Sequence, residues 1–355
     1  MNGITIGIAT YNGEKTLHRA LEAIKNQQID TASLEILAAD GGSTDGTLEI
    51  LRQHGATIIK NKSGNAIAAK NLIFQNSKND SICYIDQDEV LVNPSSLKNK
   101  FEILNLNENV FAVFSSGYTH TKEDTVINIF SSVYGDPVSQ NIYDTPNLHN
   151  LRLPKTIGSF SRSVEKGEYV LFKCRDLMKP ILLEVVATAT MISRSKSLEI
   201  GDGDLTSYEL VQLLYKATIN MGKEYQFAML TNDPISHEST NDYKSSKNKI
   251  EWRIMNQMNR KGDYELRESG LIARERYLEN FFKQKKIKHR SALFRFIRYQ
   301  INIPRQFRRV SQIICLTKNW KCLILPLISL RNITLLIISF FRAYFITRDN
   351  RRYGN

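Results

Sequence analysis

Short apolar runs and amphipathic stretches alternate along the first hundred residues. The apolar runs cover residues 3–10, 34–40, 56–60 and 81–86, and they have the length and composition of buried strands. The amphipathic stretches between them predict helices over residues 14–27, around 48–51 and over 65–76. This alternation is typical of a mostly parallel sheet with helices on both faces, which binds ligands at the carboxyl ends of its strands.

The pattern is less regular beyond residue 100. We expect further strands over residues 110–132 and a loop over 134–166, then a strand and a short helix within 182–201. Residues 207–222 predict a helix that ends at Gly222, and another helix is expected around 250–259.

Three acidic residues crowd the end of the fourth predicted strand. In "SICYIDQDEV" the apolar run leads directly to Asp86, Asp88 and Glu89. Carboxylates this close repel one another and raise each other's pKa unless a positive group lies among them, and hard divalent cations take oxygen ligands of this kind. Thr10 and Asp40 also end predicted strands, so we expect all of these residues to rim one crevice.

The positive charge is concentrated at the end of the chain. The 355 residues carry a net charge of +12, yet the segment from Lys283 onward holds 17 lysines and arginines against the single acid Asp349, and the remainder holds 31 cations against 35 acids. Clustered cations attract polyanions such as a membrane surface or a nucleic acid. We therefore expect a basic interaction segment attached to a slightly acidic body.

The cysteines and the first residues indicate the compartment. Four cysteines without paired spacing favour reduced thiols over a disulfide framework or a zinc site. The opening "MNGITIGIATYNG" has no basic leader and no small-residue cleavage site, so we expect a first strand here and not a signal peptide. Both features favour the cytosol.

Four motifs in the first hundred residues together resemble a known family. They are "IGIATYNGEKTLHRALEAIKNQ", "EILAADGGSTDGTLEIL", "NAIAAKN" and "YIDQDEVLVNP". In order and spacing they resemble the N-terminal half of the family 2 glycosyltransferases, which are inverting enzymes with a GT-A fold; the resemblance covers residues 3–95. It implies an α/β fold of GT-A type, Rossmann-like, with a nucleotide-diphosphate sugar as the donor.

The resemblance assigns a metal and a donor pocket to particular residues. Asp86 and Asp88 form the Asp-x-Asp element: Asp88 is expected to bind Mn²⁺ or Mg²⁺, directly or through water, and Asp86 to bind the ribose or the metal. Glu89 stands where relatives commonly have another Asp. A metal ion would supply the positive partner that these acids require, because it would lie between them and the diphosphate of the donor.

Further residues are expected at the nucleoside and the phosphates. By the same resemblance Thr10, Tyr11 and Asp40 line the nucleoside pocket, with Asp40 accepting hydrogen bonds from the edge of the base. Many relatives have two consecutive acids where this chain has Asp40 and Gly41, which leaves the base open. Lys70, where relatives often have Arg, is expected to hold phosphate as a point charge.

Inversion requires a general base for the acceptor hydroxyl. Relatives often read Asp-Tyr-Glu-Leu where this chain has Ser207 at the first position. Either Asp204 or Glu209 supplies the base, and we favour Asp204. His237 is a further candidate, as a ligand of the metal or the diphosphate.

The last 73 residues alternate cations with aromatic and aliphatic side chains. This favours an interfacial anchor, with Lys and Arg toward anionic headgroups and apolar groups in the acyl boundary. Spanning is disfavoured because Pro326 and Arg331 interrupt the apolar run. Nucleic-acid binding fits the aliphatic runs poorly, so we expect no nucleic acid. Packing of these last helices onto the body is a third alternative.

These features predict a metal-dependent, inverting hexosyltransferase. It would move a sugar to a saccharide acceptor in bacterial surface polysaccharide synthesis at the cytosolic face of the membrane. The C-terminal segment and the resemblance to the family together imply a lipid-linked acceptor. The expected division is a GT-A catalytic domain at residues 1–235, a helical and loop extension at 236–282 and a basic amphipathic, membrane-associating segment at 283–355. The alternatives are a catalytically degenerate membrane scaffold and, less favoured, a nucleotidylyltransferase, which should have an Arg-containing, Gly-rich first loop.

Overall fold

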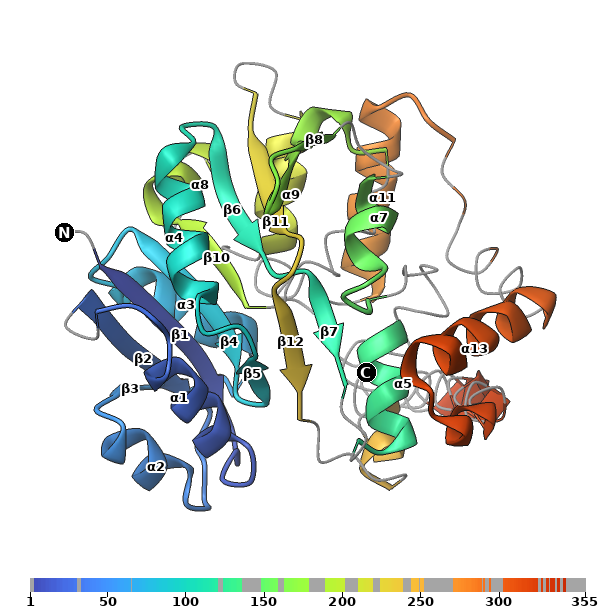
Figure 1. Cartoon of the computed structure of the whole chain (residues 1–355), viewed down its shortest axis with the longest axis horizontal. Coiled ribbons are helices and arrows are strands. Elements are labelled where there is room, and N and C mark those ends of the chain that lie inside the picture. The colour runs from blue at the N-terminus through green and yellow to red at the C-terminus, as the bar shows by residue number, and fades with distance from the viewer. Residues whose placement is uncertain are drawn as a thin grey trace, which may run out of the picture. The chain divides into compact units, whose positions relative to one another are not determined.

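The computed structural model describes most of the first 238 residues and selected parts of the remainder. The described residues are 3–30, 33–64, 66–120, 124–135, 148–158, 163–178, 189–201, 210–219, 224–238, 244–248, 250–251, 271–288, 290, 294, 303–324 and parts of 327–342. They divide into two compact units, which are shown together in Figure 1. Unit 1 consists of Met1–Thr119 with Leu148–Ser239, and unit 2 of His120–Asn147 with Thr240–Asn355.

Unit 1 is built on a nine-stranded sheet in the order β3-β2-β1-β4-β10-β6-β11-β9-β8. These strands are β1 (Ile4–Thr10), β2 (Leu34–Asp40), β3 (Thr57–Lys60), β4 (Ser81–Asp86), β6 (Val110–Phe114), β8 (Ser163–Glu165), β9 (Tyr169–Lys173), β10 (Thr190–Ser193) and β11 (Gln226–Leu230). The first four in spatial order are parallel, and of the nine described strands only β10 and β9 run in the opposite direction. The expected α/β fold with a parallel-rich sheet is confirmed.

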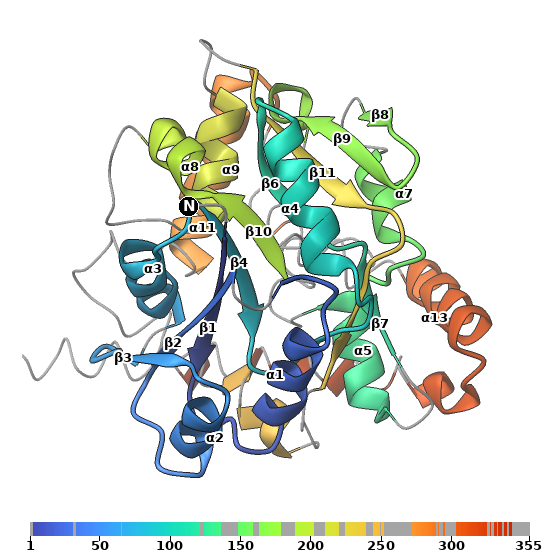
Figure 2. The same ribbon diagram turned by 60° about the vertical axis from the view of Figure 1, so that its left-hand side comes forward.

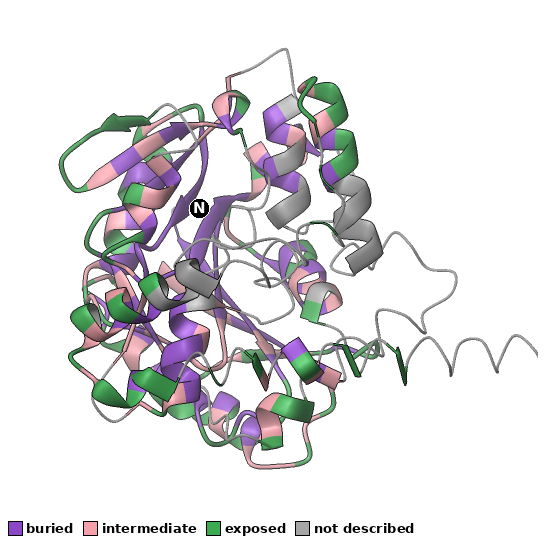
Figure 3. Cartoon of the chain, turned by 90° about the vertical axis from the view of Figure 1, so that its right-hand side faces the viewer, coloured by how far each residue is buried: buried purple, intermediate pink, exposed green. Residues whose placement is uncertain are grey.

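Helices pack on both faces of the parallel part. The helices of unit 1 are α1 (Leu17–Lys25), α2 (Thr47–Gln53), α3 (Ala66–Asn76), α4 (Ser96–Leu106), α7 (Leu153–Gly158), α8 (Arg194–Ile200) and α9 (Leu210–Ile219), with the 3₁₀ turn η2 (Cys174–Asp176). One face of β1 presents Ile6 to a cluster that includes Leu21 of α1. Gly7 points to the other face, where a Cβ would lie 2.5 Å from Ile73 of α3. Figure 2 shows α3 beside the strands, and Figure 3 colours the central strands as buried.

A second, three-stranded sheet joins segments that are distant in the sequence. Its order is β5-β12-β7, with β5 (Glu89–Leu91), β12 (Pro234–His237) and β7 (Gly117–Thr119). β12 is antiparallel to β5 and parallel to β7. Because β5 directly follows the turn after β4, this small sheet brings the end of unit 1 to the acidic segment of the sequence.

Unit 2 has its own small core. Its helices are α5 (Val126–Tyr134), α11 (Leu271–Gln284) and α13 (Ile303–Thr317), with the 3₁₀ turn η4 (Trp320–Ile324). Ile129 and Phe130 of α5 pack with Val310 and Ile313 of α13 and with Cys322. Part of the basic C-terminal segment is therefore a packed element within unit 2. Among the described residues, none of the helices has the length and apolar character needed to cross a membrane.

Two predicted elements differ from the structure. Residues 126–134, expected within a run of strands, form α5, because their apolar positions recur at helical spacing and the Thr125 side chain caps the helix by accepting from Asn128 N at 3.2 Å. The segment 134–166, expected as loop, contains α7 and the edge strand β8. The helix expected around 250–259 lies largely outside the described residues.

Candidate functional site

The carboxyl ends of β2, β1 and β4 lie side by side at one edge of the main sheet. Thr10 pairs in register with Asp40, and Ala9 pairs with Asp86. The three loops that follow these strands therefore begin at the same level. The sequence predicted this convergence from the positions at which the strands end. The pairing register explains the convergence, because parallel strands paired in register end at the same edge of the sheet.

Side chains tie the three loops to one another. Gln87 accepts from Tyr11 N at 2.9 Å, and its Nε2 donates to the Tyr11 carbonyl oxygen at 3.2 Å. Asn12 N donates to Ser43 Oγ at 2.9 Å, while Asn12 Oδ1 accepts from Thr44 N at 2.9 Å. Asn12 has a φ of 47°, a left-handed conformation that asparagine tolerates better than most residues. The loops thus form one hydrogen-bonded rim.

Asp40 is buried and holds the loop that follows it. Its Oδ2 accepts from Gly42 N at 2.8 Å and from Ser43 N at 2.9 Å, and its Oδ1 accepts from the Ser43 hydroxyl and from Thr10 Oγ1 at 3.2 Å. Burial alone would raise the pKa of this carboxyl, but the hydrogen bonds from Ser43, Gly42 and Thr10 outweigh it and lower the pKa. Asp40 is therefore an ionised carboxylate whose acceptor positions are used by its own loop and by Thr10.

Asp86 and Lys70 form an ion pair at the same edge. Lys70 Nζ, from α3, lies 3.5 Å from Asp86 Oδ1, and both side chains are partly accessible to solvent. The sequence predicted Lys70 near a phosphate and Asp86 near the ribose or the metal. The structure brings the two side chains together, so a cation from the protein already balances part of the acidic charge.

Asp88 contacts His237, the candidate from the end of β12. His237 Nε2 lies 3.3 Å from Asp88 Oδ2, with about a fifth of each side chain exposed. Burial alone would lower the pKa of His237, but its hydrogen bond to Asp88 and the charges of Asp88, Glu89 and Asp86 raise it. The Asp88 carbonyl oxygen also accepts from Glu238 N at 2.7 Å, which fixes the turn against the strand.

Glu89 is turned inward and is almost completely buried. Tyr118 donates its hydroxyl to Glu89 Oε1 at 2.9 Å, while Asp86 N at 3.1 Å and Ala189 N at 3.3 Å donate to Oε2. Burial, followed by the negative charge of Asp86, raises the pKa of Glu89 to about 7. Glu89 therefore differs in environment from the more exposed Asp86 and Asp88.

The remaining predicted residues are divided between this edge and the undescribed part. Thr10 is buried against Asp40, and Tyr11 lies on the rim with 59% of its surface exposed. Asp204 and Glu209, the two candidates for the general base, lie outside the described residues.

Three residues that sequence reasoning missed complete the arrangement: Gln87, Ser43 and Tyr118. Gln87 stands between the two aspartates of the motif, so its position was a usable signal. Tyr118 could not be found in this way, because only the pairing of β7 with β12 brings it to the site.

The donor set suits a divalent cation. Asp86 and Asp88 carry partly exposed carboxylates just after β4, where Asp86 contacts Lys70 and Asp88 contacts His237. Magnesium and manganese favour carboxylate oxygen. The acceptor oxygens of Glu89 face inward to Tyr118 and Ala189 N, so Asp86, Asp88 and His237 remain the candidate ligands. Among the described residues these three do not form a group with ligand atoms within 4.8 Å of one another, so a shared ion would require their side chains to move.

Comparison with known proteins shows a similarity to one family. Residues 5–159, which contain β1, the Asp40 loop and the Asp86–Glu89 segment, match the family model for glycosyl transferase family 2. This stretch of the chain is similar to that family, and it spans less than half of the 355 residues. The matched range extends beyond the motifs and includes Tyr118, the partner of Glu89.

Three curated relatives are similar to about a quarter of this chain. It is 26% identical over 97 residues to the poly(ribitol-phosphate) beta-N-acetylglucosaminyltransferase TarP of Staphylococcus aureus, covering 26% of this chain and 30% of that protein. It is 28% identical over 91 residues to glycosyltransferase AglE of Haloferax volcanii, covering 24% and 30%. A poly(ribitol-phosphate) beta-glucosyltransferase of Bacillus spizizenii is 28% identical over 102 residues, covering 27% and 16%. The alignments thus span less than a third of each relative.

Solved structures with a similar course of the chain have low sequence identity. Residues 1–349 of TarS of Staphylococcus aureus superpose with a TM-score of 0.47 at 12% identity, covering 99% of this chain and 92% of that one. The mannosyltransferase PcManGT of Pyrobaculum calidifontis, in complex with GDP-Man and Mn²⁺, gives a TM-score of 0.44 at 13% identity, covering 99% and 87%.

Proposed function

We propose that this protein transfers a hexose from a nucleotide-diphosphate sugar to a saccharide acceptor, with inversion at the anomeric carbon. The observation that carries the proposal is the convergence of Asp40, Asp86 and Asp88 at the joined carboxyl ends of β2 and β4. The similarity of residues 5–159 to glycosyl transferase family 2 supports the reaction class. A parallel sheet binds ligands at this edge, which is where the donor would bind.

The donor would contact all three loops. Tyr11 offers an exposed ring near the nucleoside, and Asp40 shapes the loop beneath it through Gly42 and Ser43. The Asp40 carboxylate already accepts hydrogen bonds from its own loop and from Thr10. A nucleobase that bonded directly to Asp40 would therefore have to displace one of these donors. Lys70 would contribute a positive point charge to the phosphates.

Asp88, Asp86 and His237 would hold a Mn²⁺ or Mg²⁺ ion. When bound, such an ion supplies positive charge that offsets the charge developing on the leaving diphosphate. The contact of His237 with Asp88 positions the carboxylate of Asp88, in the way that neighbouring groups commonly orient metal ligands.

Asp204 or Glu209 would act as the general base toward the acceptor hydroxyl, with Asp204 favoured. Exchange of the true base for its amide should lower transfer to the acceptor far more than hydrolysis of the donor by water. A comparison of Asp204→Asn with Glu209→Gln therefore decides between them, because only one of the two should lose transfer.

The acceptor we propose is a lipid-linked saccharide of a bacterial surface polysaccharide, reached at the cytosolic face of the membrane. Two relatives carry the polymer poly(ribitol-phosphate) in their names. The C-terminal segment supports the membrane location through five strongly exposed apolar side chains, which are Trp320, Leu323, Leu327, Leu330 and Phe341.

The deciding experiment measures donor hydrolysis and transfer by the purified full chain. A panel of nucleotide sugars is tested after chelation and again after addition of Mn²⁺ or Mg²⁺. We expect metal-dependent activity with one donor class. The activity of Asp88→Asn should be lower by at least about 100-fold, which corresponds to a few kcal/mol of transition-state stabilisation. The matched control is Asp30→Asn, the same exchange at an exposed position before β2 begins.

Three outcomes would contradict the proposal or its metal role. Full activity of Asp88→Asn, or of the chelated protein, would remove the metal role. The absence of turnover with every donor would favour a degenerate scaffold, and release of pyrophosphate from a nucleoside triphosphate and a sugar phosphate would identify a nucleotidylyltransferase.

A further inference from the structure

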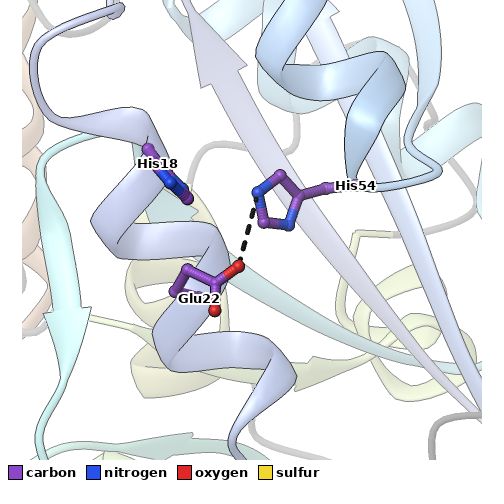
Figure 4. Close-up of side chains that lie close together, drawn as sticks. All are labelled: His18, Glu22 and His54. Carbon is purple, nitrogen blue, oxygen red and sulfur yellow. Dashed lines mark ion pairs between the residues drawn. The ribbon is translucent and has the colours of Figure 1, made fainter.

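A group of two histidines and one glutamate lies on α1 and at the end of α2, apart from the residues assigned to the transferase site. His18 and Glu22 are one turn apart on α1, and His54 is the residue that follows the last turn of α2. Figure 4 shows the three side chains converging, with the ion-pair contact drawn between His54 and Glu22. Each offers one ligand atom, and these atoms all lie within 4.8 Å of one another.

The distances are close to those of a metal site. Bonds of about 2.1 Å in a tetrahedral arrangement place ligand atoms roughly 3.4 Å apart. His54 Nε2 and Glu22 Oε1 lie 3.7 Å apart, which is near this edge length and longer than a hydrogen bond. The rings of His18 and His54 meet edge to face with centroids 5.4 Å apart. His18 is exposed, so a small rotation of its side chain can bring it into range.

The backbone that carries the three residues is firmly held. Leu17 and Leu21 of α1 and Leu51 of α2 are buried in one hydrophobic cluster, which fixes the two helices against each other. The end of α2 is also fixed: His54 N donates to Ile50 O at 3.2 Å, and Ala56 N donates to Leu51 O at 3.0 Å. Ligands on rigid helices are placed more precisely than ligands on loops.

Only 12% of the His54 side chain is exposed. Burial lowers the pKa of His54, Glu22 opposes this, and the charges of His18 and Lys25 act in the same direction as burial. Neutral imidazole is the form that binds metals.

We propose that His18, Glu22 and His54 bind a zinc-class divalent transition-metal ion, with the remaining coordination positions filled by water. Two imidazoles and one carboxylate form a donor set that suits Zn²⁺ and Co²⁺ better than Mg²⁺. The ion would link α1 to α2. Both helices begin next to the rim, since Leu17 N donates to Gly13 O at 2.9 Å and Gly13 N donates to Thr47 Oγ1 at 2.7 Å.

The test uses the untagged full chain, stripped with a chelator and titrated with Zn²⁺ or Co²⁺. We expect calorimetry to give one tight site in the wild type and in Asp88→Asn, which separates it from the proposed transferase metal. Bound Co²⁺ should produce paramagnetically shifted resonances from two imidazoles. The thermal midpoint should rise with Zn²⁺, because a ligand that binds only the folded state stabilises it.

Variants assign the ligands independently of activity. His18 is exposed, so His18→Ala should leave the metal-free protein folded. The variant should bind Zn²⁺ at least about tenfold more weakly, because loss of even a group that only hydrogen-bonds to a metal ligand has an effect of this size. His54→Gln should abolish one shifted imidazole signal, and the exposed neighbour Gln53→Ala serves as the control. A wild-type isotherm in His18→Ala, or no saturable Zn²⁺ binding by the wild type, would overturn the proposal. Circular dichroism of each metal-free variant confirms that it is folded.

Discussion

The imidazole of His237 lies 3.3 Å from the carboxylate of Asp88, although the two residues are far apart in the sequence. The pairing of β12 with β5 brings them together, because it sets His237 opposite Glu89 in an antiparallel register. The second residue of the acidic motif is therefore oriented by a strand from the end of unit 1. This contact links the function proposed for Asp88 to the small three-stranded sheet.

Loss of the imidazole should weaken the site without unfolding the chain. In His237→Ala we expect donor turnover to fall about 10- to 100-fold, the range for partners that orient metal ligands. The Mn²⁺ concentration required for half-maximal activity should rise as well. Steady-state kinetics across a Mn²⁺ series measures both effects.

A nearby charge provides the control for this prediction. Arg19→Gln removes the exposed partner of Glu238, which lies 2.7 Å away, and leaves Asp88 untouched. If Arg19→Gln reproduces the effect of His237→Ala, the cause is general electrostatics and not the contact with Asp88.

Asp40 should make the fold more stable at neutral than at acidic pH. Its hydrogen bonds hold the pKa of the carboxyl below the ordinary value, so the unfolded chain takes up the proton more readily than the folded one. The stabilisation is complete above the unfolded pKa and is lost as the pH falls through the folded pKa. Asp40→Asn should therefore cost about 1 to 3 kcal/mol at pH 7, the range for hydrogen bonds to a charged group, and much less at acid pH.

Denaturant unfolding at neutral and acidic pH measures this difference. Asp30→Asn, at an exposed position, serves as the matched control and should behave like the wild type at both values. An equal cost of Asp40→Asn at both values would mean that the amide disturbs packing and that ionisation of Asp40 contributes nothing.

Lys100 and Asp233 form a buried ion pair that supports the same strand β12. Lys100 Nζ lies 2.8 Å from Asp233 Oδ2, and both side chains are almost inaccessible to solvent. Ser96 Oγ at 2.9 Å and Ser115 Oγ at 2.7 Å also donate to Asp233. Lys100→Met should destabilise the fold by about 3 to 5 kcal/mol, because it leaves a buried carboxylate without its counter-charge.

A second variant isolates the electrostatic cause. Lys100→Met combined with Asp233→Asn should recover part of the loss in urea unfolding, since the amide carries no charge and still accepts from the two serines. Additive losses in the double variant would attribute the effect to packing instead.

The sequence predicted the parts of the site that depend on local pattern. Asp40 and Asp86 end strands whose apolar composition is clear, and parallel pairing then places them on either side of the end of β1. It could not predict that Glu89 turns inward, because its partner Tyr118 reaches it only through the pairing of β7, β12 and β5.

Other features depend on contacts that no local pattern encodes. The approach of His54 to Glu22 results from the packing of α2 on α1, and His54 lies outside the four motifs. The helix α5 was missed because its β-branched and aromatic residues favour strands. Its apolar positions nevertheless recur at helical spacing, and they pack against α13.

The C-terminal segment should bind anionic vesicles through both its charges and its apolar side chains. Lys318 and Lys321 flank Trp320, which is 73% exposed, and Leu323 follows at 61%. Each cation near an anionic surface contributes about 1 kcal/mol, so Lys318→Gln with Lys321→Gln should weaken binding roughly 30-fold at low salt. Trp320→Ser with Leu323→Ser should weaken binding at both low and high salt, because burial of apolar surface is not screened.

Co-sedimentation with vesicles of anionic or of neutral lipid separates these effects. Lys25→Gln with Lys98→Gln, which removes two exposed cations from unit 1, provides the matched control for net charge. Equal losses in the two double-lysine variants would show that overall charge, and not the C-terminal segment, governs binding. Retention of wild-type binding in both tail variants would instead mean that these apolar side chains serve another surface, and the membrane location proposed for the acceptor would lose its support from this segment.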